Sequence, residues 1–356
     1  MTNRKRYILP LMAAALLSVA LYSCKDDDDD DIQYKSFSGA LRFDIPAYVA
    51  PGDDYLMTPS GVKRNSSDEL TTAPGYYWSI KPSENSNDTT RYENSSDAVT
   101  GAKHIIIPDT LCTMTISCVA FASGYQASSA TAYPTIVKPT IPRPSLDGGT
   151  IIGSITDMKV LFGTWFSDDR DGRWYPAAGF NIGNQWWMGI NLCYGGSGRP
   201  YADCPAMKDV FGLYYTWEEA QTACPDGWHL PTKGEWATLA QKLSPEGYTD
   251  QDSVFKGLAG KMMVDASFNE EKMWPHSADN HIAGSYFNAI PTGYAYKKGA
   301  DYYFAGAFKY AAYWVKDEYD ATHGQYRYIY YDSPDVYLGI ADKSSFLASV
   351  RCLLDY

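Results

Sequence analysis

The residue types that could support catalysis or metal binding are scattered along this chain. It has five histidines and 42 acidic residues, and His276 and His281 are the only histidines close together in sequence. The chain contains no His-x-x-x-His or Cys-x-x-Cys spacing, of the kind that zinc sites commonly use. We therefore predict no metal, no cofactor and no catalytic residue, so that the chain is not an enzyme. A glycosidase pair hidden among so many carboxylates is the alternative.

One acidic run could suggest a cation site. Residues 168–172 read Asp-Asp-Arg-Asp-Gly, and hard cations such as Ca²⁺ favour clustered carboxylates. Arg170 interrupts the run, and no bidentate glutamate follows at the usual spacing. A tight turn with Asp-Gly at its tip is the better interpretation. His229, just before an expected helix, is interpreted in the same structural way, as a hydrogen-bonding residue.

Aromatic side chains supply most of the binding chemistry, with 30 tyrosines and ten tryptophans. Alternate residues of a strand face opposite ways, so Tyr326, Tyr328 and Tyr330 share one face, while Arg327, Ile329 and Tyr331 share the other. An exposed aromatic row offers flat, rigid area for a sugar ring or a protein partner. The residues predicted to stack on such a ligand are Trp187, Tyr303, Trp314, Tyr326, Tyr328 and Tyr330. A core position is the alternative for each of them.

The first of the seven cysteines belongs to a targeting signal. Arg4, Lys5 and Arg6 precede an apolar stretch, residues 7–22, that is too short to span a membrane. Residues 21–24 read Leu-Tyr-Ser-Cys, which resembles the bacterial lipobox. The resemblance implies that residues 1–23 are a signal peptide and that Cys24 is acylated. The expected partner is therefore a membrane, held through a lipid anchor on Cys24.

An acidic tether, residues 24–36, follows. It includes six consecutive aspartates, which repel one another and should stay solvated. A cysteine followed by an acidic run also resembles the surface-export signal of Bacteroidetes lipoproteins. We expect an outer-membrane protein that faces the cell exterior. Loss of the three cations in residues 1–23 would move the formal net charge from −12 to −15. So acidic a chain is a poor binder of nucleic acid, which needs clustered cations.

Residues 37–138 are expected to form an all-β domain. Its last segment, Ser123-Gly124-Tyr125 with a final strand to Val137, resembles immunoglobulin-like or PKD-like modules, which implies a β-sandwich. Residues 40–45, 75–80 and 111–121 have strand-like patterns, and the last alternates polar and apolar positions. Cys112 and Cys118 are roughly 20 Å apart in such a strand. A disulfide tolerates about 7 Å between Cα atoms, so we expect two buried free thiols.

A proline-rich linker, residues 139–149, separates this domain from a second one, residues 150–356. Three prolines between 139 and 144 favour a stiff spacer that holds the two domains apart. In the second domain, Thr216 with Glu219 and Thr232 with Glu235 form capping boxes. The helices that they begin are expected to end near Ala223 and Lys242.

Several sequence blocks of the second domain recur together in one family. Residues 182–188 read Ile-Gly-Asn-Gln-Trp-Trp-Met, residues 223–232 read Ala-Cys-Pro-Asp-Gly-Trp-His-Leu-Pro-Thr, residues 287–294 read Phe-Asn-Ala-Ile-Pro-Thr-Gly-Tyr, and residues 349–352 read Ser-Val-Arg-Cys. These blocks resemble the Fibrobacter succinogenes major paralogous domain (FISUMP). The family is similar to the formylglycine-generating-enzyme and C-type-lectin-like folds. The resemblance therefore implies an α+β, C-type-lectin-like second domain.

The same resemblance implies a disulfide between Cys224 and Cys352, which leaves Cys193 and Cys204 as a local pair. It does not carry over catalytic chemistry. The late cysteine pair of formylglycine-generating enzymes is absent, and so are the calcium-binding motifs of C-type lectins. We expect a non-catalytic surface module that binds a glycan or mediates adhesion. A structural component of a surface or pilus assembly and a hydrolase with an unrecognised site are the alternatives.

Overall fold

The computed structural model describes residues 34–63, 74–82, 90–92, 101–139, 153–158, 165–182, 185–244, 246–274 and 287–355. For residues 90–92 and 177–182 only the backbone is described. The predicted signal peptide, Cys24, the aspartate run and most of the proline-rich linker lie outside these residues. No helix in the described ranges is both long and apolar enough to cross a membrane.

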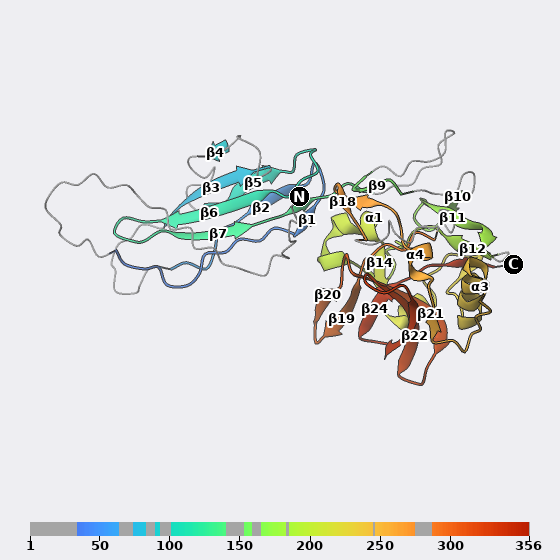
Figure 1. Ribbon diagram of the computed structural model, residues 1–356. Helices are drawn as coiled ribbons and strands as arrows, with labels where there is room; N and C mark the ends of the chain where they lie inside the picture. Colours follow the sequence, from blue (N-terminus) through green and yellow to red (C-terminus); the bar gives the residue numbers. More distant parts are fainter. Residues whose placement is uncertain are drawn as a thin grey trace, which may run out of the picture.

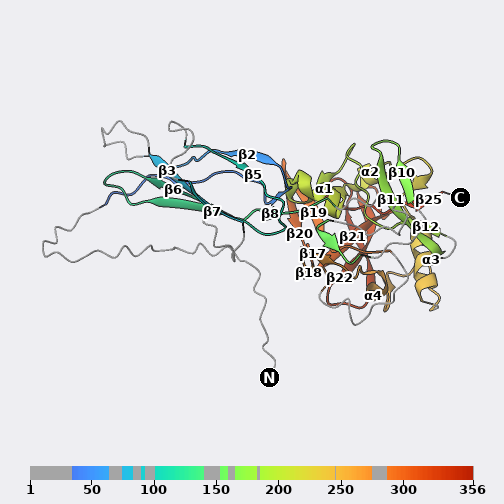
Figure 2. The ribbon, with the colours of Figure 1, turned by 90° about the horizontal axis from the view of Figure 1, so that it is seen from above.

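The described residues before 139 form strands and no helix. They are β1 (Tyr48–Val49), β2 (Asp54–Met57), β3 (Gly75–Lys81), β4 (Thr90–Tyr92), β5 (Lys103–Ile106), β6 (Thr115–Phe121), β7 (Ser128–Ala132) and β8 (Thr135–Ile136). Four of them form a sheet in the order β4-β3-β6-β7, while β2 pairs with β5 and β1 with β8. Figures 1 and 2 show this part as an elongated body at one end of the molecule.

Strand β6 has the predicted half-buried pattern. Ile116, Cys118 and Ala120 are buried on one side and pack with Trp78 of β3 in the core. The indole of Trp78 donates to the carbonyl of Gly101 at 2.9 Å. Cys112 and Cys118 are both free, as predicted, but only Cys118 is buried, while Cys112 is half-buried.

The part after residue 153 combines sheets with short helices. Its first strands are β9 (Ile155–Thr156), β10 (Trp165–Asp168), β11 (Arg173–Ile182), β12 (Gln185–Met188), β13 (Arg199–Pro200), β14 (Leu213–Tyr215), β15 (Trp228–His229), β16 (Val254–Phe255), β17 (Ser267–Phe268) and β18 (Glu271–Lys272). The later strands are β19 (Tyr294–Lys298), β20 (Asp301–Ala305), β21 (Tyr310–Glu318), β22 (His323–Tyr330), β23 (Val336–Asp342), β24 (Phe346–Ser349) and β25 (Leu353–Leu354). The helices are η1 (Tyr201–Asp203), η2 (Pro205–Met207), α1 (Lys208–Phe211), α2 (Trp217–Ala220), α3 (Lys233–Leu243) and α4 (Ala259–Met262).

Two large sheets organise this C-terminal part, and a smaller one has the order β18-β17-β9. Of the large sheets, one has the order β10-β11-β12-β25-β15, and the larger has the order β13-β14-β24-β21-β22-β23-β16. The hairpin of β19 and β20 joins the larger sheet through pairing of β19 with β24. In Figure 1 the hairpin lies beside β24, β21 and β22, with α3 on the opposite side of this part. The chain is thus mostly β-sheet with few helices.

Both predicted capping boxes are present. Thr216 begins α2, and its hydroxyl accepts from the backbone N–H of Glu219, whose carboxylate accepts from the N–H of Thr216. Thr232 and Glu235 do the same for α3. Helix α2 ends at Ala220, earlier than expected, because the next turn tightens: the Ala223 N–H bonds back three residues to the Ala220 carbonyl.

The cysteines follow the predicted pairing only in part. Cys224 and Cys352 form a disulfide, with 5.9 Å between their Cα atoms. The predicted Cys193–Cys204 pair is wrong, because both residues are free and contact different neighbours. The Cys193 thiol points to the Lys208 carbonyl and the Asp209 carboxylate. The Cys204 thiol instead points to the carbonyl of Ala202, close to Tyr48 of the N-terminal part.

The two parts of the chain touch each other. The ring of Tyr48 in β1 meets that of Tyr201 edge-on at 5.7 Å, and the side-chain amide of Asn269 donates to the Ile136 carbonyl at 2.9 Å. Val137 packs within the apolar core of the C-terminal part. The prediction that a stiff linker holds the domains apart is therefore wrong, because apolar surface at the end of the first part is buried against the second.

Candidate binding face

The acidic run 168–172 forms a turn, as predicted. Gly172 donates its N–H to the Asp168 carbonyl at 2.7 Å. Arg170 occupies both carboxylate oxygens of Asp168, with its Nε at 2.9 Å and its Nη2 at 2.8 Å. Because the one buried carboxylate of the run is paired within the turn, it is not free to bind a cation. No group of three or more His, Cys, Asp or Glu side chains that could hold a metal occurs within the described ranges.

His229 has a structural position between two carboxylates. Its Nε2 lies 2.9 Å from Glu235 Oε1, and its Nδ1 contacts the carboxylate of Asp355. The other oxygen of Glu235 caps helix α3 by accepting from the Thr232 N–H. The histidine thus connects the start of α3 to the end of the chain, which agrees with the hydrogen-bonding role expected for it.

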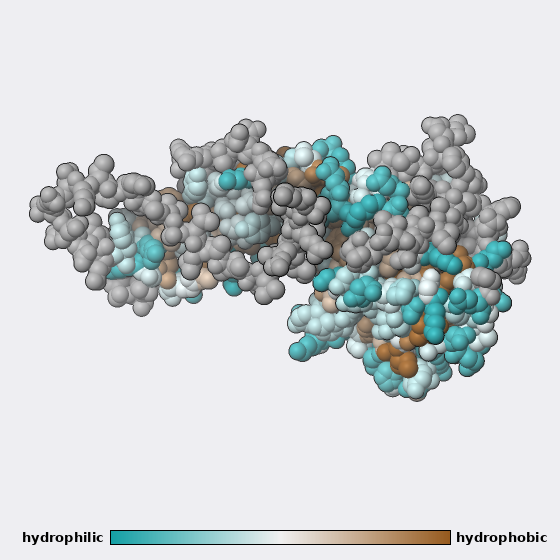
Figure 3. Space-filling view, viewed as in Figure 1, coloured by the Kyte–Doolittle hydropathy of each residue, from teal (hydrophilic) through white to brown (hydrophobic). Residues whose placement is uncertain are grey.

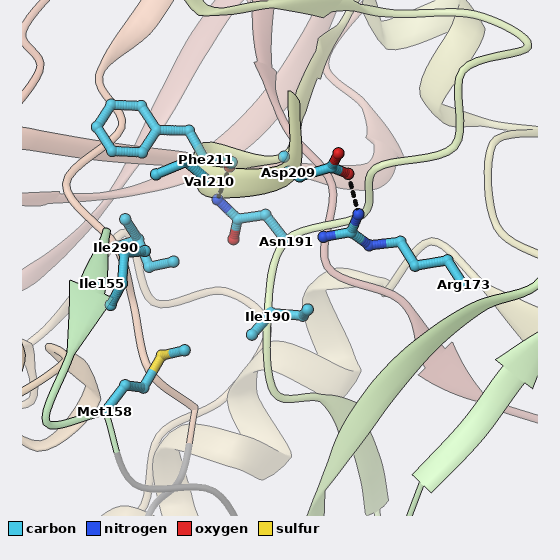
Figure 4. Close-up of a pocket in the computed structure, with 10 residues that line it drawn as sticks. Ile155, Met158, Arg173, Ile190, Asn191, Asp209, Val210, Phe211 and Ile290 are labelled. Atoms are coloured by element: carbon cyan, nitrogen blue, oxygen red, sulfur yellow. Dashed lines mark hydrogen bonds and ion pairs between the residues drawn. The ribbon is translucent and has the colours of Figure 1, made fainter. Parts of the chain in front are cut away.

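A small pocket lies beside helix α1 (Figure 4). Ile155, Met158 and Ile190 line its apolar side, while Asn191 and an ion pair between Arg173 and Asp209 lie opposite. Its volume of about 10 Å³ admits about one water molecule. The pocket is therefore too small for a sugar or a cofactor.

Two of the predicted stacking residues are in the core instead. Trp187 is fully buried, with its ring edge-on to Trp236 at 4.9 Å and its Nε1 donating to Gln185. Trp314 is also fully buried and donates to the Tyr215 carbonyl at 2.7 Å. The prediction fails for both because neighbouring aromatic rings cover them, and Tyr326 and Phe346 cover Trp314.

The alternation predicted for residues 326–331 is present in β22. Arg327 and Ile329 are buried on the inner side, while Tyr326 and Tyr328 are half-buried and Tyr330 is exposed on the outer side. The ring of Tyr328 stacks on Tyr310 of β21 and on Tyr337 of β23, each at 5.1 Å between centroids. The tyrosines of three adjacent strands thus form one layer.

The layer continues across β24 and the β19–β20 hairpin. Phe346 contacts Tyr326 at 4.8 Å and Tyr294 at 5.3 Å. Tyr296 and Tyr303 stack at 5.3 Å and are 41% and 43% exposed. We call the whole layer the aromatic face, and its members are Tyr294, Tyr296, Tyr303, Tyr310, Tyr326, Tyr328, Tyr330, Tyr337 and Phe346.

Sequence reasoning missed Tyr294, Tyr296, Tyr310, Tyr337 and Phe346. Each lies in an alternating strand, and that pattern is visible in the sequence. Whether these rings lie next to Tyr328 depends on the register of the paired strands, which a single sequence does not reveal. The pairing of Tyr328 with Tyr337 and of Tyr310 with Tyr330 brings these rings into one face.

Glycines make room for two aromatic rings above the sheet. A Cβ atom at Gly339 would come within 2.4 Å of the Tyr326 ring, so this ring lies directly over β23. A Cβ at Gly324 would meet the ring of Trp217 from α2 at 2.3 Å. The backbone positions between the rings are therefore part of the face.

The centre of the aromatic face carries no charged side chain of its strands. Between the rings, strand alternation places Ala305, Ala312 and Ala348. Charges occur at the ends, at the Lys298–Asp301 pair of the hairpin tip and at exposed Lys316. In the view of Figure 3, strongly apolar residues occur in small patches on the C-terminal part. The face is thus aromatic, neutral and rich in hydroxyl groups.

The hydroxyls of Tyr310, Tyr326 and Tyr328 stay protonated at neutral pH. Burial raises the pKa of Tyr310 far above its ordinary value of 10, and the neighbouring Tyr326 raises it further. Burial also raises the pKa of Tyr326 and of Tyr328. These side chains can therefore both donate and accept hydrogen bonds.

We expect this shift to appear in an alkaline titration followed by tyrosinate absorbance. A raised pKa means that the folded state holds its proton while the unfolded state loses it near pH 10. Stability contributed in this way is complete below that pH and falls as the pH rises above it. Tyr310→Phe should remove one late-ionising group and leave the early ones unchanged. Ionisation of every tyrosine near pH 10 in the folded chain would contradict this expectation.

Arg351, from the last family block, lies fully buried beneath the sheets. Its guanidinium donates to the carbonyls of Met188, Phe287 and Asn288 and to the side-chain oxygen of Asn191. Burial lowers its pKa to about 10, which still leaves it charged at neutral pH. The segments around residues 188, 191, 288 and 351 therefore meet at one buried cation. Their role in this structure is to hold the fold together.

Comparison with known proteins agrees with the predicted family. The geometry defines the chain as a mostly β protein with an exposed aromatic face. Residues 180–353 match the family model described as the Fibrobacter succinogenes major domain. This match supports the FISUMP family for the C-terminal part.

Other comparisons add little. No curated protein matches the chain. One solved structure, a superoxide reductase (neelaredoxin) from Ignicoccus hospitalis, is 7% identical and aligns over 28% of this chain and 80% of its own. Its TM-score is 0.21, which does not indicate a shared fold.

Proposed function

We propose that this protein is a non-catalytic binding module of the cell surface, which captures glycans on the aromatic face. In this proposal Cys24 carries a lipid that anchors the chain in the outer membrane, facing outward. The N-terminal part is an immunoglobulin-like or PKD-like sandwich, and the C-terminal part has a C-type-lectin-like fold. The expected partners are the membrane and a glycan, with no nucleic acid, metal or cofactor.

The continuous aromatic face is the observation that carries the proposal. Tyrosine combines an apolar ring, which can pack against the C–H groups of a sugar, with a hydroxyl that can bond to the sugar hydroxyls. Stacking between Tyr328 and its neighbours already fixes these rings, so little side-chain entropy is lost on binding. Exposure of three rings, Tyr296, Tyr303 and Tyr330, leaves the ligand a place to begin contact.

A glycan array probed with the soluble chain, residues 25–356, tests the proposal. We expect specific binding of one glycan class, and Tyr328→Ala should weaken it at least tenfold, a change of about 1.4 kcal/mol. Tyr319→Ala is the matched control, since Tyr319 is 60% exposed and is not a member of the aromatic face. Circular dichroism of both variants verifies that they fold.

Other outcomes favour other functions. Glycan-independent pull-down of envelope proteins, with a negative array, would favour a structural component of a surface assembly. Breakdown of a polysaccharide by the purified chain would favour a hydrolase. Binding that Tyr328→Ala does not affect would show that the aromatic face is not the contact surface.

The anchoring is tested separately in cells. We expect Cys24→Ser to abolish metabolic labelling with a fatty acid and to release the protein from the membrane fraction. Removal of the aspartates at 26–31 should instead keep the lipid but reduce digestion by protease added to intact cells. Incorporation of the fatty acid into the Cys24→Ser variant would disprove lipid attachment at Cys24.

A further inference from the structure

One row of rings in the aromatic face crosses the strands instead of following one of them. It runs through Tyr337 of β23, Tyr328 of β22, Tyr310 of β21 and Tyr294 of β19. Successive ring centroids are 5.1, 5.1 and 5.4 Å apart. Neighbouring strands of a sheet lie about 4.8 Å apart, so the sheet itself sets this regular step.

The rings of this row present the same groups repeatedly. Tyr337, Tyr328 and Tyr310 are almost parallel, with interplanar angles of 21° and 19°. Tyr294 is turned edge-on to Tyr310, with an interplanar angle of 70°. All four rings are half-buried, and the hydroxyls of Tyr310 and Tyr337 bond to Tyr326 and Ser333. A surface that repeats one chemical group at a constant step is complementary to a ligand that repeats its own unit at a similar step.

The charge of the face limits the kind of polymer. Its centre holds alanines and glycine between the rings, and the whole chain has a formal net charge of −12. An acidic polymer would meet no cation at the centre and would be repelled by the protein as a whole. A nucleic acid is disfavoured for the same reason. A neutral polymer with many hydroxyl groups can contact the ring edges and form hydrogen bonds with the phenol groups.

We infer that the aromatic face binds an internal segment of an extended, uncharged polysaccharide, with consecutive sugar units lying along Tyr337, Tyr328, Tyr310 and Tyr294. The inference rests on the proposed glycan function and adds the ligand class and its direction across the strands. Each ring contributes to a separate sugar unit, so affinity depends on the length of the bound segment.

Calorimetric titration of the soluble chain with neutral cello-, manno- and xylo-oligosaccharides tests this inference. For the series that binds, we expect affinity to rise roughly two- to tenfold with each added sugar unit, the range of aromatic stacking energies. The rise should stop at about four units, when the row is filled. A polysaccharide with the same linkage should bind no less tightly than the longest oligosaccharide.

Variants locate the two ends of the row. Tyr337→Ala and Tyr294→Ala should each reduce the length at which affinity stops rising by about one unit, whereas Tyr328→Ala should weaken all lengths. Tyr319→Ala should change none of them. Circular dichroism excludes loss of folding, and Tyr337→Phe, which keeps the ring, should retain most of the length dependence.

The outcomes separate this inference from the function on which it rests. Equal affinity for a monosaccharide and for its polymer would overturn the inference and leave glycan binding intact. Length dependence that the row variants leave unchanged would also overturn it. Absence of binding to every oligosaccharide and to every glycan on the array would overturn both.

Discussion

Replacement of Arg351 by alanine is expected to lower the free energy of unfolding of the C-terminal part by about 3–5 kcal/mol. The four oxygens that its guanidinium satisfies, three carbonyls and the side-chain oxygen of Asn191, lie in the buried interior. A buried acceptor that loses its donor costs about 1–3 kcal/mol. The variant avoids the cost of desolvating a guanidinium on folding. This gain offsets only part of the loss, because the alanine also leaves a cavity.

Urea denaturation of the soluble chain, followed by tryptophan fluorescence, measures this change. The C-terminal part contains almost all of the tryptophans, so its transition dominates the signal. Arg351→Lys should also destabilise, because an ammonium cannot reproduce the planar fork of a guanidinium. Arg199→Ala, which removes a partly exposed arginine paired with Asp203, should cost less than about 1 kcal/mol. A loss at Arg351 as small as that at Arg199 would contradict the structural role.

Removal of the disulfide is expected to cost a similar amount. The bond between Cys224 and Cys352 closes a loop with a sequence separation of 128 residues. In the chain-entropy model such a loop is worth about 4–5 kcal/mol. Cys224→Ala with Cys352→Ala should therefore reduce the urea midpoint strongly, and addition of a reductant to the native chain should have the same effect.

Alkylation of the unfolded, unreduced chain provides the control. Mass spectrometry should find Cys193 and Cys204 alkylated, because both are free, and Cys224 and Cys352 protected. Cys193→Ala should leave the effect of the reductant on stability unchanged. If Cys193 and Cys204 were protected instead, the cysteine assignment given by the structure would be wrong.

The features that the sequence predicted well are local. Capping boxes at Thr216 and Thr232 need only four consecutive residues, and the alternation of Tyr326, Tyr328 and Tyr330 needs only the two-residue period of a strand. The cysteine pair 224–352 needed a resemblance to a family, since its members are far apart in the chain. The cysteine pair 193–204 was wrong because nearness in sequence does not bring two thiols together.

The features that sequence reasoning missed depend on long-range packing. Trp187 and Trp314 are of a residue type that is common in ligand sites. Segments distant in sequence cover both of them. Arg351 would be expected at the surface, since arginine is rarely fully buried. Its burial depends on carbonyls from residues 188, 287 and 288, which only the fold brings together.

The hydrogen bonds between Lys138 and Ser154 have a consequence for how the protein tolerates change. The Lys138 N–H donates to the Ser154 hydroxyl at 2.8 Å, and the Ser154 N–H donates to the Lys138 carbonyl at 3.2 Å. The two ends of the proline-rich segment are therefore fastened to each other. Insertion or deletion of residues between them is therefore expected to leave the separation of the two domains unchanged.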